Sequence, residues 1–226
     1  SRWKRTSTAY LLQQLGKVAL ASVAIGVLLP LLVLLEFSLA ATVSIALAAW
    51  VVLSIGKDVS NRIVNKPTPI QGLRALSLSY YGMQAAHLGV AVMLVGIGLT
   101  SYFSVEKSVL LEQGQSIDLA GYDFVFIGSS AVTGPNFIGE EAEISVLKAG
   151  VEIEVLHPQR RIYTASGSPS TEMDIDAGLL RDLFITLGEE KQAGAWSMTI
   201  YVKPFIRWVW LGAIFMVFGA TLAAGD

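Results

Sequence analysis

Residues 80–101 read YYGMQAAHLGVAVMLVGIGLTS, an apolar run that is long enough to cross a bilayer as a single helix. The run carries one imidazole, His87, about two helical turns from its start. An ionisable side chain is costly to bury at membrane depth, so those that occur there usually serve a function. This stretch therefore gives both the class of the protein and its first candidate site residue.

The composition of the whole chain agrees with a membrane protein. Of its 226 residues, 53% are apolar and 15% are charged, whereas soluble domains are about 45–50% apolar and about 25% charged. The formal net charge of −2 gives no indication of a nucleic-acid partner. The chain has no cysteine, which excludes disulfides, thiolate metal ligands and thioether attachment of a cofactor to this chain.

Four apolar runs predict four membrane-spanning helices, at about residues 18–35, 37–56, 80–102 and 204–226. Pro30 lies inside the first run and is expected to kink that helix. Glu36 marks a very short turn after it. Pro204 is expected in the first turn of the last helix, a position that suits proline, and Trp208 and Trp210 are expected at the outer membrane interface.

The basic residues predict the orientation of these helices. A leader with Arg2, Lys4 and Arg5 precedes the first helix, and the polar segment 57–77 contains four more Lys or Arg residues. Loops rich in Lys and Arg stay on the cytoplasmic side. Residues 105–203 are therefore expected on the outer side, and His87 in the cytoplasmic half of its helix. Within 57–77 the alternatives are a short interfacial helix at 59–64 and a solvated loop, and the prolines there favour the loop.

Small residues recur along the third helix. Gly82, Gly89 and Gly96 are seven residues apart, and such residues allow a second helix or a flat cofactor to approach the backbone closely. The spacing fits both alternatives. Met83 lies one turn from His87, and we interpret it as a packing residue, because as a ligand it would compete with its own neighbour for the same face of a metal.

Two interpretations of His87 fit the pattern. The imidazole can hydrogen-bond to a neighbouring helix or reach the interface, or it can be an axial ligand to a haem held between helices. The spacing alone does not separate them.

Residues 105–203 are no longer membrane-like and are expected to form a β-rich domain with its own core. Alternating apolar residues and Gly or Pro turns predict its strands, at 117–119, 124–126, 143–148, 151–156, 183–187 and 197–202. Ala149-Gly150 is a strong hairpin signal, while 134–136 and 166–170 are expected to be loops. His157 lies in this domain beside Pro158 without a Cys or His partner at metal-site spacing, which is typical of a surface residue.

Four segments together resemble one known family. They are the Gly82-Met83 and Ala86-His87-Leu88-Gly89 run, LHPQRRIY at 156–163, Arg181-Asp182-Leu183, and KPFIRWVWLG at 203–212. In their order and spacing they are similar to the C-terminal part of the CcmF family, which includes CycK and NrfE. These are membrane subunits of the haem lyase of bacterial cytochrome c maturation. Gln159 departs from the acidic residue expected at that position.

The resemblance implies a cofactor. CcmF-like proteins hold a b-type haem between two transmembrane histidines, and His87 matches one of them. The second axial ligand, the other haem histidines and a tryptophan-rich segment are expected upstream of Ser1. The chain opens without an initiator methionine, and we expect it to be a piece of a longer protein.

The resemblance also implies a reaction and its partners. The thiols of a Cys-x-x-Cys-His motif in apocytochrome c add across the haem vinyl groups, which requires ferrous iron. The membrane haem is expected to relay electrons to incoming haem, with quinol as a possible donor. Expected partners are apocytochrome c, a haem-chaperone protein that delivers haem, CcmH-like maturation subunits and membrane lipids.

The expected protein is therefore a multi-pass protein of the bacterial inner membrane. Four transmembrane α-helices would carry a β-rich periplasmic domain, residues 105–203, inserted between the third and the fourth. We find no nucleophile, general base or phosphate-binding loop in the chain, and we expect the β-rich domain to be a docking surface. A fragment of a membrane transporter and a purely structural membrane anchor are the alternatives. Against a transporter, we find no acidic residue in mid-membrane and no inverted repeat.

Overall fold

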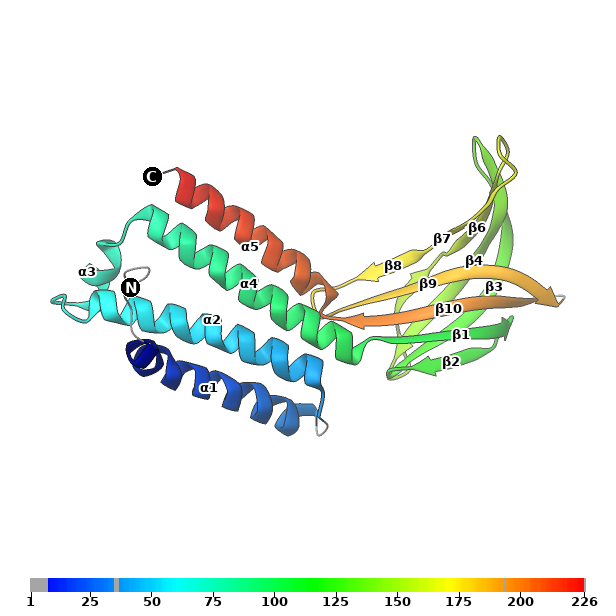
Figure 1. The fold of residues 1–226 in the computed structure, drawn as a ribbon. Helices are drawn as coiled ribbons and strands as arrows, with labels where there is room; N and C mark the ends of the chain where they lie inside the picture. The colour runs from blue at the N-terminus through cyan, green and yellow to red at the C-terminus, as the bar shows by residue number, and fades with distance from the viewer. Residues whose placement is uncertain (1–7, 35–36, 193, 226) are drawn as a thin grey trace. The chain divides into compact units, whose positions relative to one another are not determined.

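The computed structural model describes residues 8–34, 37–192 and 194–225. The chain divides into two compact units, Ser1–Tyr102 with Phe205–Asp226, and Phe103–Pro204. The first unit is helical and the second consists of strands (Figure 1). The predicted basic leader at Arg2, Lys4 and Arg5 and the predicted turn at Glu36 lie outside the described residues.

The helical unit contains five described helices. They are α1 (Thr8–Leu34), α2 (Leu39–Ile63), α3 (Pro69–Arg74), α4 (Leu78–Phe103) and α5 (Ile206–Ala224). Four of these are long and apolar enough to cross a membrane, and α3 is a single short helix. The first helix starts well before the predicted residue 18, and it continues through Pro30.

The connection between α2 and α4 differs from the predicted solvated loop. Helix α2 continues to Ile63, because Asp58 and Arg62 form an ion pair of 3.0 Å one turn apart on its surface. The short helix α3 then begins at Pro69, where the Thr68 hydroxyl accepts a hydrogen bond from the Gln71 amide. The helix named as an alternative at 59–64 is present as the end of α2, whereas the favoured solvated loop was wrong and α3 was missed.

The start of α5 also differs from the prediction. Pro204 is the last residue of a strand and not the first turn of the helix, which begins at Ile206. Phe205 between them adopts a left-handed backbone conformation, with φ of 59°, which is uncommon for a residue other than glycine. The Trp208 ring packs edge-on against the Phe205 ring, with centroids 5.4 Å apart.

The helices pack through small residues. A Cβ atom added at Gly89 of α4 would lie 2.5 Å from the Gly212 carbonyl oxygen of α5, and one added at Gly26 of α1 would lie 2.5 Å from the Ala46 side chain of α2. Gly98 of α4 meets Ser44 of α2 in the same way. Backbones that approach this closely gain van der Waals contact that larger side chains would prevent.

The second unit is a sandwich of two antiparallel sheets. One sheet has the strand order β1-β10-β9-β8, and the other has the order β2-β3-β4-β6-β7, with β5 also paired to β4. The strands are β1 (Val105–Glu112), β2 (Ser116–Leu119), β3 (Tyr122–Thr133), β4 (Phe137–Lys148), β5 (Val151–Leu156), β6 (Gln159–Tyr163), β7 (Pro169–Glu172), β8 (Asp174–Ala177), β9 (Arg181–Gln192) and β10 (Ala195–Pro204).

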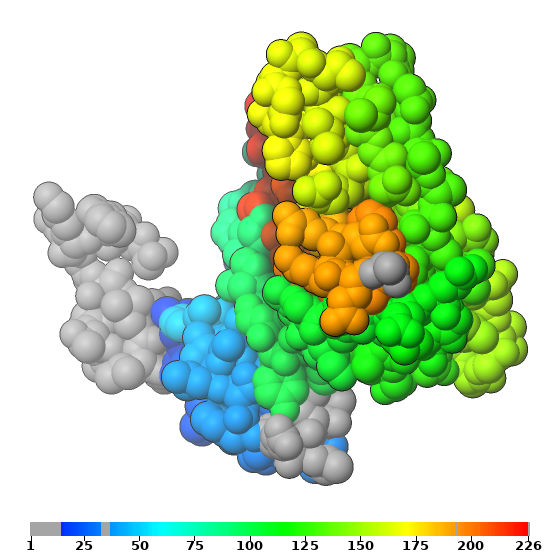
Figure 2. Space-filling model, turned by 90° about the vertical axis from the view of Figure 1, so that its right-hand side faces the viewer, coloured from blue at the N-terminus to red at the C-terminus, as the bar shows by residue number. Residues whose placement is uncertain are grey.

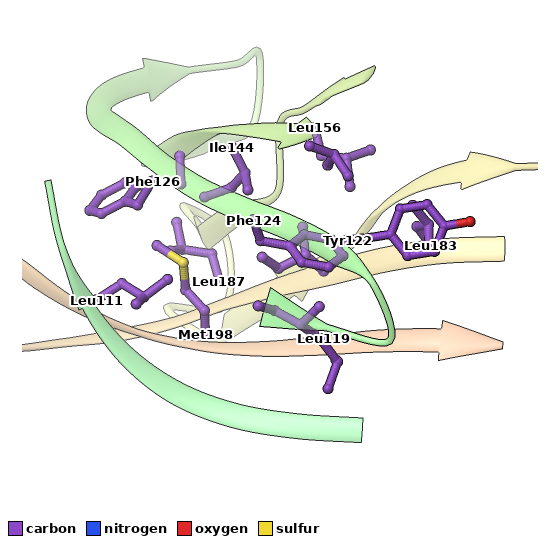
Figure 3. Close-up of a cluster of buried hydrophobic side chains, with 14 of the residues drawn as sticks. Leu111, Leu119, Tyr122, Phe124, Phe126, Ile144, Leu156, Leu183, Leu187 and Met198 are labelled. Atoms are coloured by element: carbon purple, nitrogen blue, oxygen red, sulfur yellow. The ribbon is translucent and has the colours of Figure 1, made fainter. Parts of the chain in front are cut away.

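Alternating side chains from both sheets fill the core of the sandwich. Phe124 and Phe126 of β3 point inward toward Leu187 and Met198 of the opposite sheet (Figure 3), and all four are almost completely buried. The six predicted strand segments all lie in strands, and the Ala149-Gly150 turn joins β4 to β5 with positive φ at both residues. The sequence analysis missed β1, β6, β7 and β8.

Candidate functional site

His87 lies in the first half of α4, where its ring is held by its own helix. Its Nδ1 atom is 2.7 Å from the carbonyl oxygen of Met83, one turn earlier. Because a carbonyl oxygen can only accept, Nδ1 carries the proton and donates it to this bond. The Nε2 atom is then the nitrogen with the free lone pair, which is the form of imidazole that binds a metal.

His87 opens onto a groove between α2 and α4. The groove has a volume of about 560 Å³. Most of its lining is apolar and comes from Leu47, Trp50, Val51, Ile55 and Leu94. Ligand sites in proteins are of this kind, concave and largely apolar with a few polar groups that fix the orientation of the ligand. Met83 also lines the groove and is 40% exposed.

The polar end of the groove is built around Asp58. Its Oδ2 atom accepts hydrogen bonds from the Tyr80 hydroxyl at 2.8 Å, from Arg62 Nε at 3.0 Å and from Gln84 Nε2 at 3.2 Å. The Arg62 guanidinium also lies 4.5 Å from the centre of the Tyr80 ring. Gln84 precedes His87 by three residues on α4, so the cluster and the imidazole belong to one surface.

The sequence analysis missed this cluster. It counted Arg62 only as a basic loop residue and did not use Asp58. The i,i+4 spacing of these two residues was the available signal, because such a pair favours a continuing helix. The bonds to Tyr80 and Gln84 cross from one helix to another, and no local pattern encodes them. Asp58 lies in the last turns of α2, so the expectation of no acidic residue at mid-membrane depth is not contradicted.

The glycines of the seven-residue repeat in α4 do not lie on the face of the helix that carries His87. Gly82, Gly89 and Gly96 pack against α5, next to Gly219, Gly212 and Trp208 respectively. At about 100° per residue, His87 projects away from that face. The structure therefore decides between the two alternatives for the glycines, and helix packing is the correct one.

His157 has the surroundings of a surface residue. It lies at the bend between β5 and β6, and its side chain is 47% exposed. Its amide donates a hydrogen bond to Asp174 at 2.7 Å, and its ring lies 3.8 Å from a Glu141 oxygen. In the part of the chain that the structure describes, no three His, Cys, Asp or Glu side chains form a metal site.

A second polar cluster joins the two sheets of the sandwich at Tyr122. Its hydroxyl accepts from Lys148 Nζ at 3.3 Å and from Arg181 Nε at 3.4 Å, and Arg181 is ion-paired with Asp176. Burial raises the pKa of the Tyr122 phenol, but the hydrogen bonds and charges of Arg181 and Lys148 outweigh it, so this pKa lies below its ordinary value. The arrangement ties the sheets together and offers no nucleophile–base pair.

Comparisons with known proteins identify relatives over the whole chain. The family model described as the CcmF C-terminal beta-sandwich matches residues 102–204. The chain is 43% identical over 225 residues to the cytochrome c-type biogenesis protein CcmF of Pseudomonas fluorescens, covering 100% of this chain and 34% of the relative. For CcmF of Escherichia coli strain K12 the identity is 36%, with the same coverage.

A solved structure is also similar. The structure of a "Cytochrome c Heme Lyase CcmF" matches with a TM-score of 0.75 at 18% identity, over 100% of this chain and 36% of the solved chain. At this identity the match concerns the fold alone. The chain spans about a third of the length of the curated relatives that it matches.

Proposed function

Because the chain belongs to the CcmF family as its C-terminal part, we propose that the groove beside His87 holds a b-type haem and that His87 is one of its axial ligands. The protein functions in cytochrome c biogenesis as part of a haem lyase. The observation that carries the proposal is the bond from His87 Nδ1 to the Met83 carbonyl, which leaves Nε2 to bind iron.

The residues around the groove fit such a group. Its apolar walls suit a macrocycle, and its volume lies within the range of about 300–1,000 Å³ that is common for ligand sites. At the polar end Arg62, which is ion-paired with Asp58, would offer its guanidinium to one of the two carboxylates that a haem carries. His87 would hold the iron, and the second axial ligand would come from outside this chain.

Each part of the site has a separate task in this proposal. The Met83 carbonyl fixes the tautomer and the orientation of the His87 ring. The side chains of Leu47, Val51 and Leu94 line the groove and would surround a bound haem with apolar surface. When bound, a haem with two imidazole ligands supplies a low-spin, one-electron redox centre. Such a centre is suited to pass electrons from a quinol to incoming haem. This reduction would supply the ferrous iron that attachment requires.

The sandwich has a different role in the proposal. It faces the periplasm and offers docking surfaces to apocytochrome c, to a haem chaperone or to other maturation subunits. The support for a docking role is that its buried residues form a structural core, whereas its polar groups, Tyr122 and Arg181 among them, hold strands together.

The test of the haem ligand is the variant His87→Ala in the full-length protein. We expect most of the b-type haem bands to disappear from the reduced-minus-oxidised spectrum, while the protein still inserts into the membrane. His157→Ala is the matched control and should retain the bands, because its ring is exposed and beside Glu141. His87→Gly with added imidazole should restore part of the signal. Full retention of the low-spin bands in His87→Ala would refute the assignment.

A further inference from the structure

Three turns of the sandwich share an unusual composition. The β2–β3 turn contains Ala120-Gly121, the β4–β5 turn contains Ala149-Gly150, and the β8–β9 turn runs from Gly178 to Leu180. None of these turn residues carries a charge, although turns on protein surfaces are usually polar. The turns at 113–115, 134–136 and 164–168 are also uncharged, but they contain Gln, Asn, Ser or Thr, whereas these three turns contain only Ala, Gly and Leu.

The strand register places the three turns at one end of the sandwich. Arg181, which follows the β8–β9 turn, pairs with Pro204 at the end of β10. The same Arg181 side chain contacts Tyr122, the first residue after the β2–β3 turn. Lys148, the last residue before the β4–β5 turn, also contacts the Tyr122 hydroxyl. Val105 at the start of β1 pairs with Val202 of β10, so the chain enters and leaves the domain at this end.

Three aliphatic side chains are exposed at this end, beside the exposed charged residues Lys148, Asp123 and Glu152. Leu179 is 63% exposed, Leu180 is 61% exposed, and Val151 beside the β4–β5 turn is 65% exposed. Each therefore leaves much of its apolar surface exposed to water. Transfer of that surface to an apolar medium would lower the free energy.

The opposite end of the sandwich is polar. The β9–β10 turn follows Glu189, Glu190 and Lys191, and an ion pair of 2.8 Å links Glu189 to Lys191. Figure 2 views the molecule from the side where this turn, in orange, faces the reader. Gln113, Gly114 and Gln115 form the β1–β2 turn. The 113–115 turn and the end of β9 are thus polar, although Ile138 near the start of β4 is 52% exposed at this same end.

Chain connectivity determines what lies beside the apolar end. One residue, Ser104, separates α4 from β1, and one residue, Phe205, separates β10 from α5. Consecutive Cα atoms are about 3.8 Å apart, so Val105 and Pro204 lie within a few ångströms of the ends of two helices that are long enough to cross a membrane. Both connections to the helical unit therefore leave the sandwich at this end.

We propose that the turns at 120–121, 149–151 and 178–180 form a lipid-contact surface, and that Leu179, Leu180 and Val151 enter the interfacial layer of the bilayer. Lipid is the occupant that the residues favour. The aliphatic side chains are spread over two turns, and contact with lipid does not require a shape-complementary partner. A protein partner more often meets Trp, Tyr and Arg anchors, and Arg181 at this end is already ion-paired with Asp176. The proposal is independent of the haem assignment.

The test uses spin labels in the full-length protein, reconstituted in nanodiscs of phosphatidylcholine and phosphatidylglycerol. This chain contains no cysteine, and any cysteine elsewhere in the full-length protein is first replaced by serine. Leu180→Cys and Val151→Cys probe the apolar end. Lys191→Cys is the matched control at the opposite end, because the Lys191 side chain is 57% exposed. Power saturation compares collisions of each label with oxygen, which concentrates in lipid, and with a water-soluble nickel complex.

We expect the ratio of collisions with oxygen to collisions with the nickel complex to be several-fold higher for labels at positions 180 and 151 than for the label at position 191. A label at 180 that collides with nickel as often as the label at 191 faces water, and this result would overturn the proposal. A label at 180 that is shielded from both reagents is covered by protein, and this result would overturn it as well.

Discussion

At the scale of single residues, His87 shows how far a sequence can predict a site. It is the sole imidazole in the predicted spans, and its Nδ1 partner follows from helix geometry, since the carbonyl four residues earlier is within reach of a helical side chain. The sequence therefore indicated a candidate ligand. The Asp58 cluster beside it could not be predicted, because Tyr80 and Gln84 are 22 and 26 residues from Asp58.

Tyr122 gives a prediction at the same scale. Tyr122→Phe removes the acceptor that Lys148 and Arg181 share, and hydrogen bonds to charged groups contribute about 1.5–3 kcal/mol each. At 3.3 and 3.4 Å both bonds are long, so we expect a loss near the lower end of that range. Thermal unfolding of the two proteins in the same detergent measures it. An unchanged midpoint would contradict the idea that this residue ties the two sheets together.

The pH dependence of stability provides a second prediction for Tyr122. Its pKa is lower in the folded chain than the ordinary value of about 10. Between these two values the unfolded chain binds more protons, so this residue makes the protein more stable as the pH rises through that window. The Tyr122→Phe variant should lack this rise in stability with pH. The Tyr163→Phe variant, which removes a hydroxyl beside Glu172, should retain it. Thermal unfolding midpoints of the parent protein and both variants at several alkaline pH values test this prediction.

At the scale of secondary-structure elements, the glycine repeat of α4 was visible in the sequence but its partner was not. A spacing of seven residues predicts a face of close approach. That α5 occupies this face depends on contacts such as Gly89 with Gly212, more than a hundred positions apart. The strands show the same limit. The Ala149-Gly150 hairpin was predictable from local signals. Strand β1 was missed because, among the described strands, its ladder partner is β10, the last strand of the domain in sequence.

The packing of α4 on α5 leads to a prediction about stability. Gly89→Ala places a methyl group 2.5 Å from the Gly212 carbonyl oxygen, and overpacking of this kind costs about 1–3 kcal/mol. Gly56→Ala is the matched control on α2, where an added Cβ meets no atom within 4 Å. The control should leave the unfolding temperature unchanged or raise it, since alanine favours helix. Equal midpoints for both variants would count against close packing of α4 and α5.

At the scale of the whole molecule, the proposal that the sandwich is periplasmic depends on the Lys and Arg bias around α1 and α2. A reporter that is active only in the periplasm should work when fused near Asn136, in the β3–β4 turn, and should fail when fused near Lys66, between α2 and α3. The reverse pattern would place His87 in the opposite half of the bilayer and would contradict the periplasmic assignment of the sandwich.

The pairing of β1 with β10 also has a consequence for synthesis. Ser108 of β1 meets Thr199 of β10 across 91 positions of the chain. Among the described strands, β1 has no other ladder partner. During translation, β1 must therefore wait as an unpaired edge until β10, at the end of the domain sequence, has been synthesised. Contacts between distant residues slow folding, and an unpaired edge strand invites pairing with other chains. The synthesis of residues 105–203 is thus the interval in which this protein is most exposed to misassembly.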